Sequence, residues 1–356
     1  MIEFTRYLYI KQDVETALIG SLLNKDKDLA LFWAFELFHS GFTQGALLVL
    51  WNAYYGFYAT ESPAMEAYMK KREATMDPEE FIVTFVSNLV IRPSNTDVFF
   101  LSGAAQKTEE DDDYVEWDLT KRLEEKNYEA IAHALVSMSK EKSKLTKAKK
   151  QLSTYFESKG MKRPTFAVTC DHVAPSLILI ARTMTYYAQL AKSTNEKKKN
   201  LYVVAGEGTS SEFRTIEVNY PDEKPPKLFP KLAKHSPETN GILSVFMPSH
   251  SNETLDTYRG KWIIDAYHTT PIWRKRVEEY GGKYSKDDGD IVWDNVDNEE
   301  EFWERYYYDT DEQPMEIQRK NIPSYNARMT MQQFCDTYKK SGLYTPCPEL
   351  LEALTD

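Results

Sequence analysis

The chain of 356 residues contains little cysteine, histidine or glycine. Its three cysteines, Cys170, Cys335 and Cys347, are too few for a disulfide framework, and no cysteine or histidine pair has the spacing of a zinc site. The six histidines are scattered, without an HExxH or HxH pattern. The scarcity of cysteine favours a reducing, intracellular compartment. We therefore expect no metal site and no cofactor site.

Basic residues are fewer than acidic ones, with 44 Lys and Arg against 55 Asp and Glu. The formal net charge is −11 and the isoelectric point is about 5.3. An acidic surface repels phosphate backbones, so nucleic acid is a possible partner but not the favoured one. The first residues carry charges at Glu3, Arg6, Lys11 and Asp13, and we expect no signal peptide there.

One long segment lacks charge altogether. Residues Leu37 to Thr60 contain no Asp, Glu, Lys or Arg, which is long enough to span a bilayer. The segment is interrupted by Ser40-Gly41, a pair that ends helices, and each helix on either side is too short to cross a membrane alone. Two buried helices are therefore favoured over a transmembrane hairpin, and we expect no membrane span.

The stretch LALFWAFELFHSGF, Leu29 to Phe42, is apolar around most of a helical wheel. Glu36 and His39 share one narrow polar strip, which predicts a pair on one face of the helix. A helix that is apolar nearly all round is a buried helix. We expect this stretch to form the centre of an N-terminal helical domain rather than a binding surface.

Helical spacing, capping residues and prolines divide the first part of the chain into consecutive helices joined by short loops, as in a helical bundle. The predicted helices cover residues 11–24, 44–58, 64–72, 78–92 and 120–139, and a further helix is capped by Asp26 or Asp28 and stops at Ser40-Gly41. Gly160 and Pro164 mark a boundary, which predicts a helical domain over 1–160 and a mixed α+β domain over 164–356.

The second part of the chain mixes helices with short strands. Residues 175–191 predict a buried helix, and residues 261–280 predict a helix that is broken at Pro271. The strands are predicted at 201–205, 213–218, 242–247 and 291–293. The predicted fold class is α+β, mainly α, in which an N-terminal helical bundle precedes a helix-rich half with a small antiparallel sheet.

Three short motifs carry chemical alternatives, and none has a complete signature. Gly206-Glu207-Gly208-Thr209 follows a predicted strand but lacks the ending of a phosphate loop, so a hairpin turn is favoured. Cys170 and His172 are close in sequence, although catalytic pairs are assembled in space. The acidic cluster from Asp287 to Asp294 lacks the EF-hand spacing and is favoured as a solvated turn. We predict no catalytic residues.

Two surface features are candidates for binding. The lysine-rich segment Lys140 to Lys150, followed later by Lys197 to Lys199, favours a solvated helix face and leaves open an anion-binding face. The candidate anion contacts are Lys142, Lys149, Lys150, Lys197 and Lys198. Aromatic residues beside acidic ones indicate either a core or an interaction surface. The candidate interaction residues are Trp273, Phe302, Trp303, Tyr306 and Tyr307.

Two patches of the chain resemble an uncharacterised family encoded by nucleocytoplasmic large DNA viruses of algae and protists. The first joins Asp13-Val14-Glu15-Thr16-Ala17-Leu18 to the helix ALFWAFELFHSGF, and the second runs from Thr270-Pro271-Ile272-Trp273 to Asp311-Glu312-Gln313. The resemblance covers about a fifth of the chain. It implies a viral origin and expression in host cytoplasm, and it implies no reaction.

These observations lead to three hypotheses. The leading one is a non-enzymatic viral interaction or structural protein that contacts other viral or host proteins, with a virion-associated (minor capsid) variant. The second is an accessory factor in viral nucleic-acid or mRNA processes, which depends on the lysine segments. The third is a divergent enzyme with a site between the two halves, near Cys170, His172 and residues 206–210.

Overall fold

The computed structural model describes residues 1–107, 118–168, 170, 173–191, 201–204, 235 and 262–306. These residues belong to two compact units that alternate along the chain. Unit 1 contains the described residues of 1–49, 76–90 and 204–337, and unit 2 contains those of 50–75 and 91–203. The predicted boundary at 160–164 falls inside unit 2, and the division into folding domains 1–160 and 164–356 stays a prediction.

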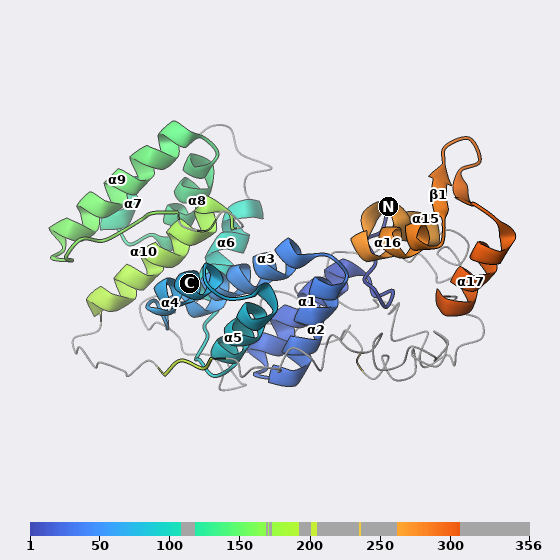
Figure 1. Ribbon diagram of the computed structural model, residues 1–356. Coiled ribbons are helices and arrows are strands. Elements are labelled where there is room, and N and C mark those ends of the chain that lie inside the picture. The colour runs from blue at the N-terminus through green and yellow to red at the C-terminus, as the bar shows by residue number, and fades with distance from the viewer. Residues whose placement is uncertain are drawn as a thin grey trace. The chain divides into compact units, whose positions relative to one another are not determined.

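Unit 1 is built on three helices from the N-terminal part of the chain. Helices α1 (Lys11–Leu23) and α2 (Lys27–His39) lie against each other, and α5 (Pro78–Val90) lies against both (Figure 1). The unit also contains α15 (Trp262–Thr269), α16 (Pro271–Glu279), strands β1 (Gly282–Ser285) and β2 (Asp290–Trp293), and α17 (Val296–Tyr306).

Helix α2 has well-defined signals at both ends. Asp26 caps its start, where the carboxylate accepts a hydrogen bond from the Leu29 amide at 3.0 Å. The helix ends at Gly41, whose φ of +89° suits glycine, and the amides of Gly41 and Phe42 reach back to the carbonyls of Phe38 and Leu37. Every residue from 30 to 37 is buried. The prediction of a central buried helix is confirmed.

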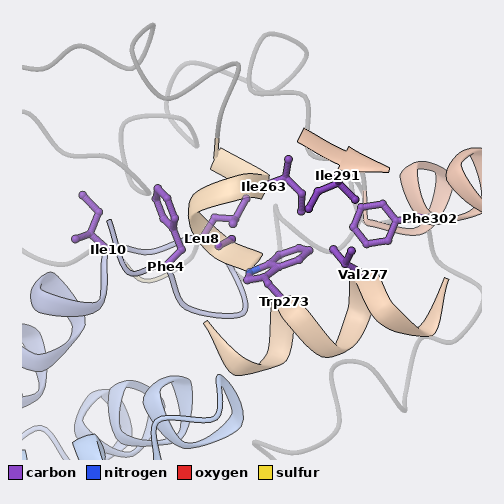
Figure 2. Close-up of a cluster of buried hydrophobic side chains, with 9 residues drawn as sticks. Phe4, Leu8, Ile10, Ile263, Trp273, Val277, Ile291 and Phe302 are labelled. Atoms are coloured by element: carbon purple, nitrogen blue, oxygen red, sulfur yellow. The ribbon is translucent and has the colours of Figure 1, made fainter. Parts of the chain in front are cut away.

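The N-terminal residues form a small loop that packs on α15 and α16. Phe4 and Ile10 pair in an antiparallel bridge, and the Thr5 amide donates to the Tyr9 carbonyl at 2.8 Å. Phe4, Leu8 and Ile10 then join a buried cluster with side chains from α15, α16, β2 and α17 (Figure 2). Figure 2 shows these side chains as one continuous row that ends at Phe302.

Unit 2 is helical in its described residues. It contains the end of α3 (Thr43–Ala53), the π-helix η1 (Tyr54–Tyr58), α4 (Met65–Glu73), α6 (Asp97–Lys107), α7 (Leu119–Glu124), α8 (Tyr128–Ser139), α9 (Lys142–Ser158) and α10 (Pro175–Ala191). Helix α8 contacts α6, α7, α9 and α10 (Figure 1). It is buried because its Ala, Ile, Leu and Val side chains contact these four neighbours.

The predicted fold class, α+β and mainly α with a small antiparallel sheet, is confirmed. The sheet of the described residues pairs β1 with β2, so that Gly282 faces Trp293 and Ser285 faces Asp290. The strand prediction at 291–293 is confirmed, whereas residues 201–204 have no regular structure and the prediction there is wrong. The strands predicted at 213–218 and 242–247 lie outside the described residues.

Candidate functional site

A cavity of about 680 Å³ lies within unit 2. Its walls come from η1, α4, the segment at Thr165–Ala167 and α10. The volume is typical of sites that hold small organic ligands. The lining residues are Tyr54, Tyr55, Ala59, Pro63, Ala64, Glu66, Ala67, Lys70, Thr165, Ala167, Arg182, Thr185, Tyr186 and Gln189.

The π-helix supplies the aromatic floor of the cavity. In this turn the Ala59 amide donates to the Tyr54 carbonyl at 2.8 Å, five residues back, so the helix is wider here than in α3. Tyr54 and Tyr55 both line the cavity, with their ring centroids 5.0 Å apart. Single π turns at the end of α-helices are frequent at functional sites. This turn makes the cavity the leading candidate site.

A partly buried ion pair fixes the polar side of the cavity. The guanidinium of Arg182 on α10 lies 2.6 Å from the Glu66 carboxylate on α4, and their side chains are 12% and 18% exposed. The Tyr55 hydroxyl donates to the same carboxylate at 2.9 Å. Arg182 also donates to the Thr165 carbonyl at 2.9 Å. These bonds connect α4, η1, α10 and the Thr165 segment around one charged pair.

Helix α10 presents one face to the cavity. Arg182, Thr185, Tyr186 and Gln189 follow one another at the three- and four-residue spacing of a helix face. The Tyr186 hydroxyl accepts a hydrogen bond from the Thr165 amide at 2.8 Å and lies 3.2 Å from the Thr165 carbonyl. The helix therefore holds the wall segment in place through its side chains.

Tyr54 and Lys70 also line the cavity, and neighbouring groups determine the charge state of the first and the position of the second. Burial, and next the negative charge of Glu66, raise the pKa of Tyr54 well above its ordinary value, and its hydroxyl donates to the Ser62 carbonyl at 3.2 Å. The Lys70 ammonium lies 4.2 Å above the Trp51 ring and donates to Glu73 at 3.1 Å. Tyr54 therefore remains protonated at neutral pH, and Lys70 brings a cation to the cavity.

The aromatic residues predicted to bind a partner lie together in unit 1. Trp273 and Phe302 are buried, at 2% and 0% exposure, whereas Trp303 and Tyr306 are partly buried around them. The Trp273 indole donates to the Thr5 carbonyl at 3.0 Å. Tyr307 lies outside the described residues. The buried pair fills a core, and the role of the group in binding a partner stays a prediction.

The lysines of the anion prediction lie on α9 where they are described. Lys142 and Lys150 are exposed and Lys149 is half-buried, while the opposite side of the helix buries Ala148, Leu152 and other residues. Lys197 and Lys198 lie outside the described residues. The described lysines thus occupy the solvated face that an amphipathic helix presents.

The chemical motifs of the sequence find little support in the described part of the chain. Cys170 is buried, while His172 and residues 206–210 lie outside the described residues. The turn before β2 holds Asp288, whose carboxylate accepts from the Ser285 hydroxyl at 2.6 Å. Among the described residues, no group of three or more His, Cys, Asp or Glu side chains is placed to hold a metal ion.

Glu36 differs from its prediction. The sequence predicts a pair with His39, whereas in the structure the Glu36 side chain is 0% exposed and lies 2.9 Å from Arg6. Its other oxygen accepts from the Tyr7 amide at 3.2 Å. The residue is buried because the N-terminal loop covers it, and this contact joins residues 30 positions apart, beyond the reach of helical periodicity.

Sequence reasoning missed the cavity. It assigned Tyr54, Tyr55 and Tyr58 to the apolar face of one continuous α-helix, and it left Glu66 and Arg182 unremarked. The run YYGFY, with a glycine among aromatic residues, is the signal that marks the change of helix type.

No family model, curated protein or solved structure matches this chain. Within the described residues, none of the helices combines the length and the apolar character needed to cross a membrane.

Proposed function

We propose that this chain is a non-enzymatic binding protein that holds a ligand in the unit 2 cavity. The observation that carries the proposal is a cavity of about 680 Å³ with three tyrosines and an ion pair on its walls. Tyrosine rings offer large apolar faces at a low cost in side-chain entropy, which suits recognition.

The bonding of the polar groups supports binding rather than chemistry. Glu66 is engaged by both Arg182 and Tyr55, and Arg182 is shared with the Thr165 carbonyl. A carboxylate held by two donors is a poor general base, because protonating it would weaken both bonds. These groups brace the walls and leave the apolar rings to contact a ligand.

The proposal is tested with N-phenylnaphthylamine, a neutral aromatic dye whose fluorescence rises in apolar sites. We expect the full chain to bind it with a stoichiometry of one. Ala67→Trp fills the cavity from an exposed position on α4 and should abolish binding. Ala74→Trp, at the exposed end of the same helix and outside the lining, is the control. Equal binding by both variants would refute the proposal.

A second candidate function, contact with a protein partner, is favoured by exposed apolar residues in unit 1. Val292 on β2 and Val296 at the start of α17 are 46% and 66% exposed. Nine acidic and three basic residues lie between Gly282 and Tyr306, so a basic partner surface would be complementary. Val296→Asp should release a partner captured by affinity purification, whereas Ile91→Asp, exposed in unit 2, should not.

The resemblance to proteins of large DNA viruses supports a viral setting for either function, in host cytoplasm or in the virion. Mass spectrometry of purified virions tests the virion-associated variant. Abundance in infected cytoplasm together with absence from particles would refute it.

An accessory role in nucleic-acid processes rests on the exposed lysines of α9. It requires that binding to a labelled RNA or DNA duplex weaken steeply as salt is raised. A flat salt dependence would exclude this role.

A further inference from the structure

We infer that the unit 2 cavity takes a small organic anion with an aromatic body. This inference rests on the proposed function and adds the chemical class of the ligand. It follows from the shape of the apolar walls and from the sign of the charge that the cavity presents.

The apolar walls suit a flat ring system. The small side chains of Ala59, Ala64, Ala67 and Ala167 line the cavity together with the tyrosine rings. Aromatic rings prefer offset or edge-to-face neighbours, and Tyr54 and Tyr55 already adopt an interplanar angle of 67°. An aromatic ligand extends this arrangement, whereas a flexible chain would lose more conformational entropy on binding.

The charged groups of the lining favour an anion. One lining residue is acidic, Glu66, and two are basic, Lys70 and Arg182. The Glu66 charge is matched by Arg182 at 2.6 Å. Lys70 supplies the remaining charge of the lining, and its own partner, Glu73 at 3.1 Å, does not line the cavity.

Lys70 has donor capacity to spare. Its ammonium carries three N–H donors, and Glu73 takes one of them at 3.1 Å. Glu73 does not line the cavity, and its second oxygen accepts from the Trp51 indole at 3.1 Å. A ligand in the cavity would therefore lie against Lys70 and not against Glu73. A ligand sulfonate, carboxylate or phosphate can accept a charge-assisted hydrogen bond there.

Two dyes with the same aromatic body separate the two parts of the inference. Anilinonaphthalene sulfonate carries an anionic group, and N-phenylnaphthylamine lacks it. We expect the sulfonate to bind about tenfold more tightly at low salt, as one charge-assisted hydrogen bond provides. Raising the ionic strength should reduce this preference, because the ammonium is partly exposed.

Substitution at Lys70 tests the origin of the preference. Lys70→Gln should remove most of the difference between the dyes while leaving the neutral dye bound, which also shows that the variant is folded. Lys71→Gln, exposed on the same helix and outside the lining, is the matched control. The inference is overturned if both dyes bind equally or if Lys70→Gln leaves the preference unchanged.

The outcomes distinguish this inference from the proposed function. If the neutral dye binds and is lost in Ala67→Trp, the cavity is a ligand site whatever its charge preference. If neither dye binds the unmodified chain, the proposed function fails and the inference fails with it.

Discussion

The buried ion pair between Arg6 and Glu36 offers the sharpest test of unit 1. The Arg6 Nε atom lies 2.9 Å from a Glu36 oxygen, and the side chains are 5% and 0% exposed. The second Glu36 oxygen accepts from the Tyr7 amide. Glu36→Leu leaves a buried guanidinium and a buried amide without these acceptors, so both lose the groups that compensate their desolvation.

The expected cost of Glu36→Leu is about 3–5 kcal/mol, the range found when one partner of a buried pair is removed. Replacing both residues, as in Arg6→Met with Glu36→Leu, removes the charge together with its counter-charge. The double variant should therefore recover at least about 2 kcal/mol relative to the sum of the single variants. Glu279→Leu, which breaks an exposed pair with Lys275, is the control and should cost less than about 1 kcal/mol.

Urea unfolding of the full chain, followed by tryptophan fluorescence, measures these differences. With a slope near 3 kcal/mol per molar urea, the midpoint of Glu36→Leu should fall by about 1–1.7 M. Strict additivity of the two single variants, or a loss below about 1 kcal/mol for Glu36→Leu, would show that the pair is not coupled in the folded protein.

Three further predictions concern the same unit, and urea midpoints test each of them. Trp33→Ala should lower the free energy of unfolding by roughly 3–5 kcal/mol, because it removes a buried side chain from α2. A variant as stable as the parent would mean that α2 is exposed. Gly41→Ala should lower the free energy of unfolding more than Gly289→Ala does. Both glycines have positive φ, but a Cβ at Gly41 would lie 2.6 Å from Pro271, whereas nothing lies within 4 Å of a Cβ at Gly289. Equal losses in the two variants would argue against the contact with Pro271. Burial lowers the pKa of Lys25 from 10.5 to about 8, so as the pH rises the Lys25 ammonium loses its proton in the folded state before it does so in the unfolded state. The free energy of unfolding, relative to that of Lys25→Gln, should therefore rise between pH 8 and pH 10.5. A difference between the two proteins that stays constant over this range would contradict the shift.

Local signals predicted most of the helices. Asp26 at the start of α2, Gly41 at its end and Pro175 at the start of α10 act within one turn, so their effect can be read from neighbouring residues. The apolar run around Trp33 identified a buried helix for the same reason, since burial on all sides leaves no polar face.

The predictions that failed concern residues whose structure depends on contacts with segments distant in the sequence. Residues 201–204 have high strand propensity, yet Tyr202 instead stacks on Tyr68 at 3.8 Å between ring centroids. Glu36 was paired with His39 in the prediction because its partner in the structure, Arg6, lies outside the helix. The cavity depended on Glu66 meeting Arg182, a contact across 116 positions that no local pattern encodes.

The N-terminal loop has a consequence for synthesis of the chain. Side chains of Thr269, Thr270, Trp273 and Arg276 donate hydrogen bonds to the backbone carbonyls of Ile2, Phe4, Thr5 and Arg6. Residues 2–6 are therefore synthesised about 270 positions before the side chains that bind them, an interval of about 15–50 s at ordinary elongation rates. During that interval Phe4 and Leu8 lack their partners, so a chaperone that shields this segment of the nascent chain should raise the yield of folded protein.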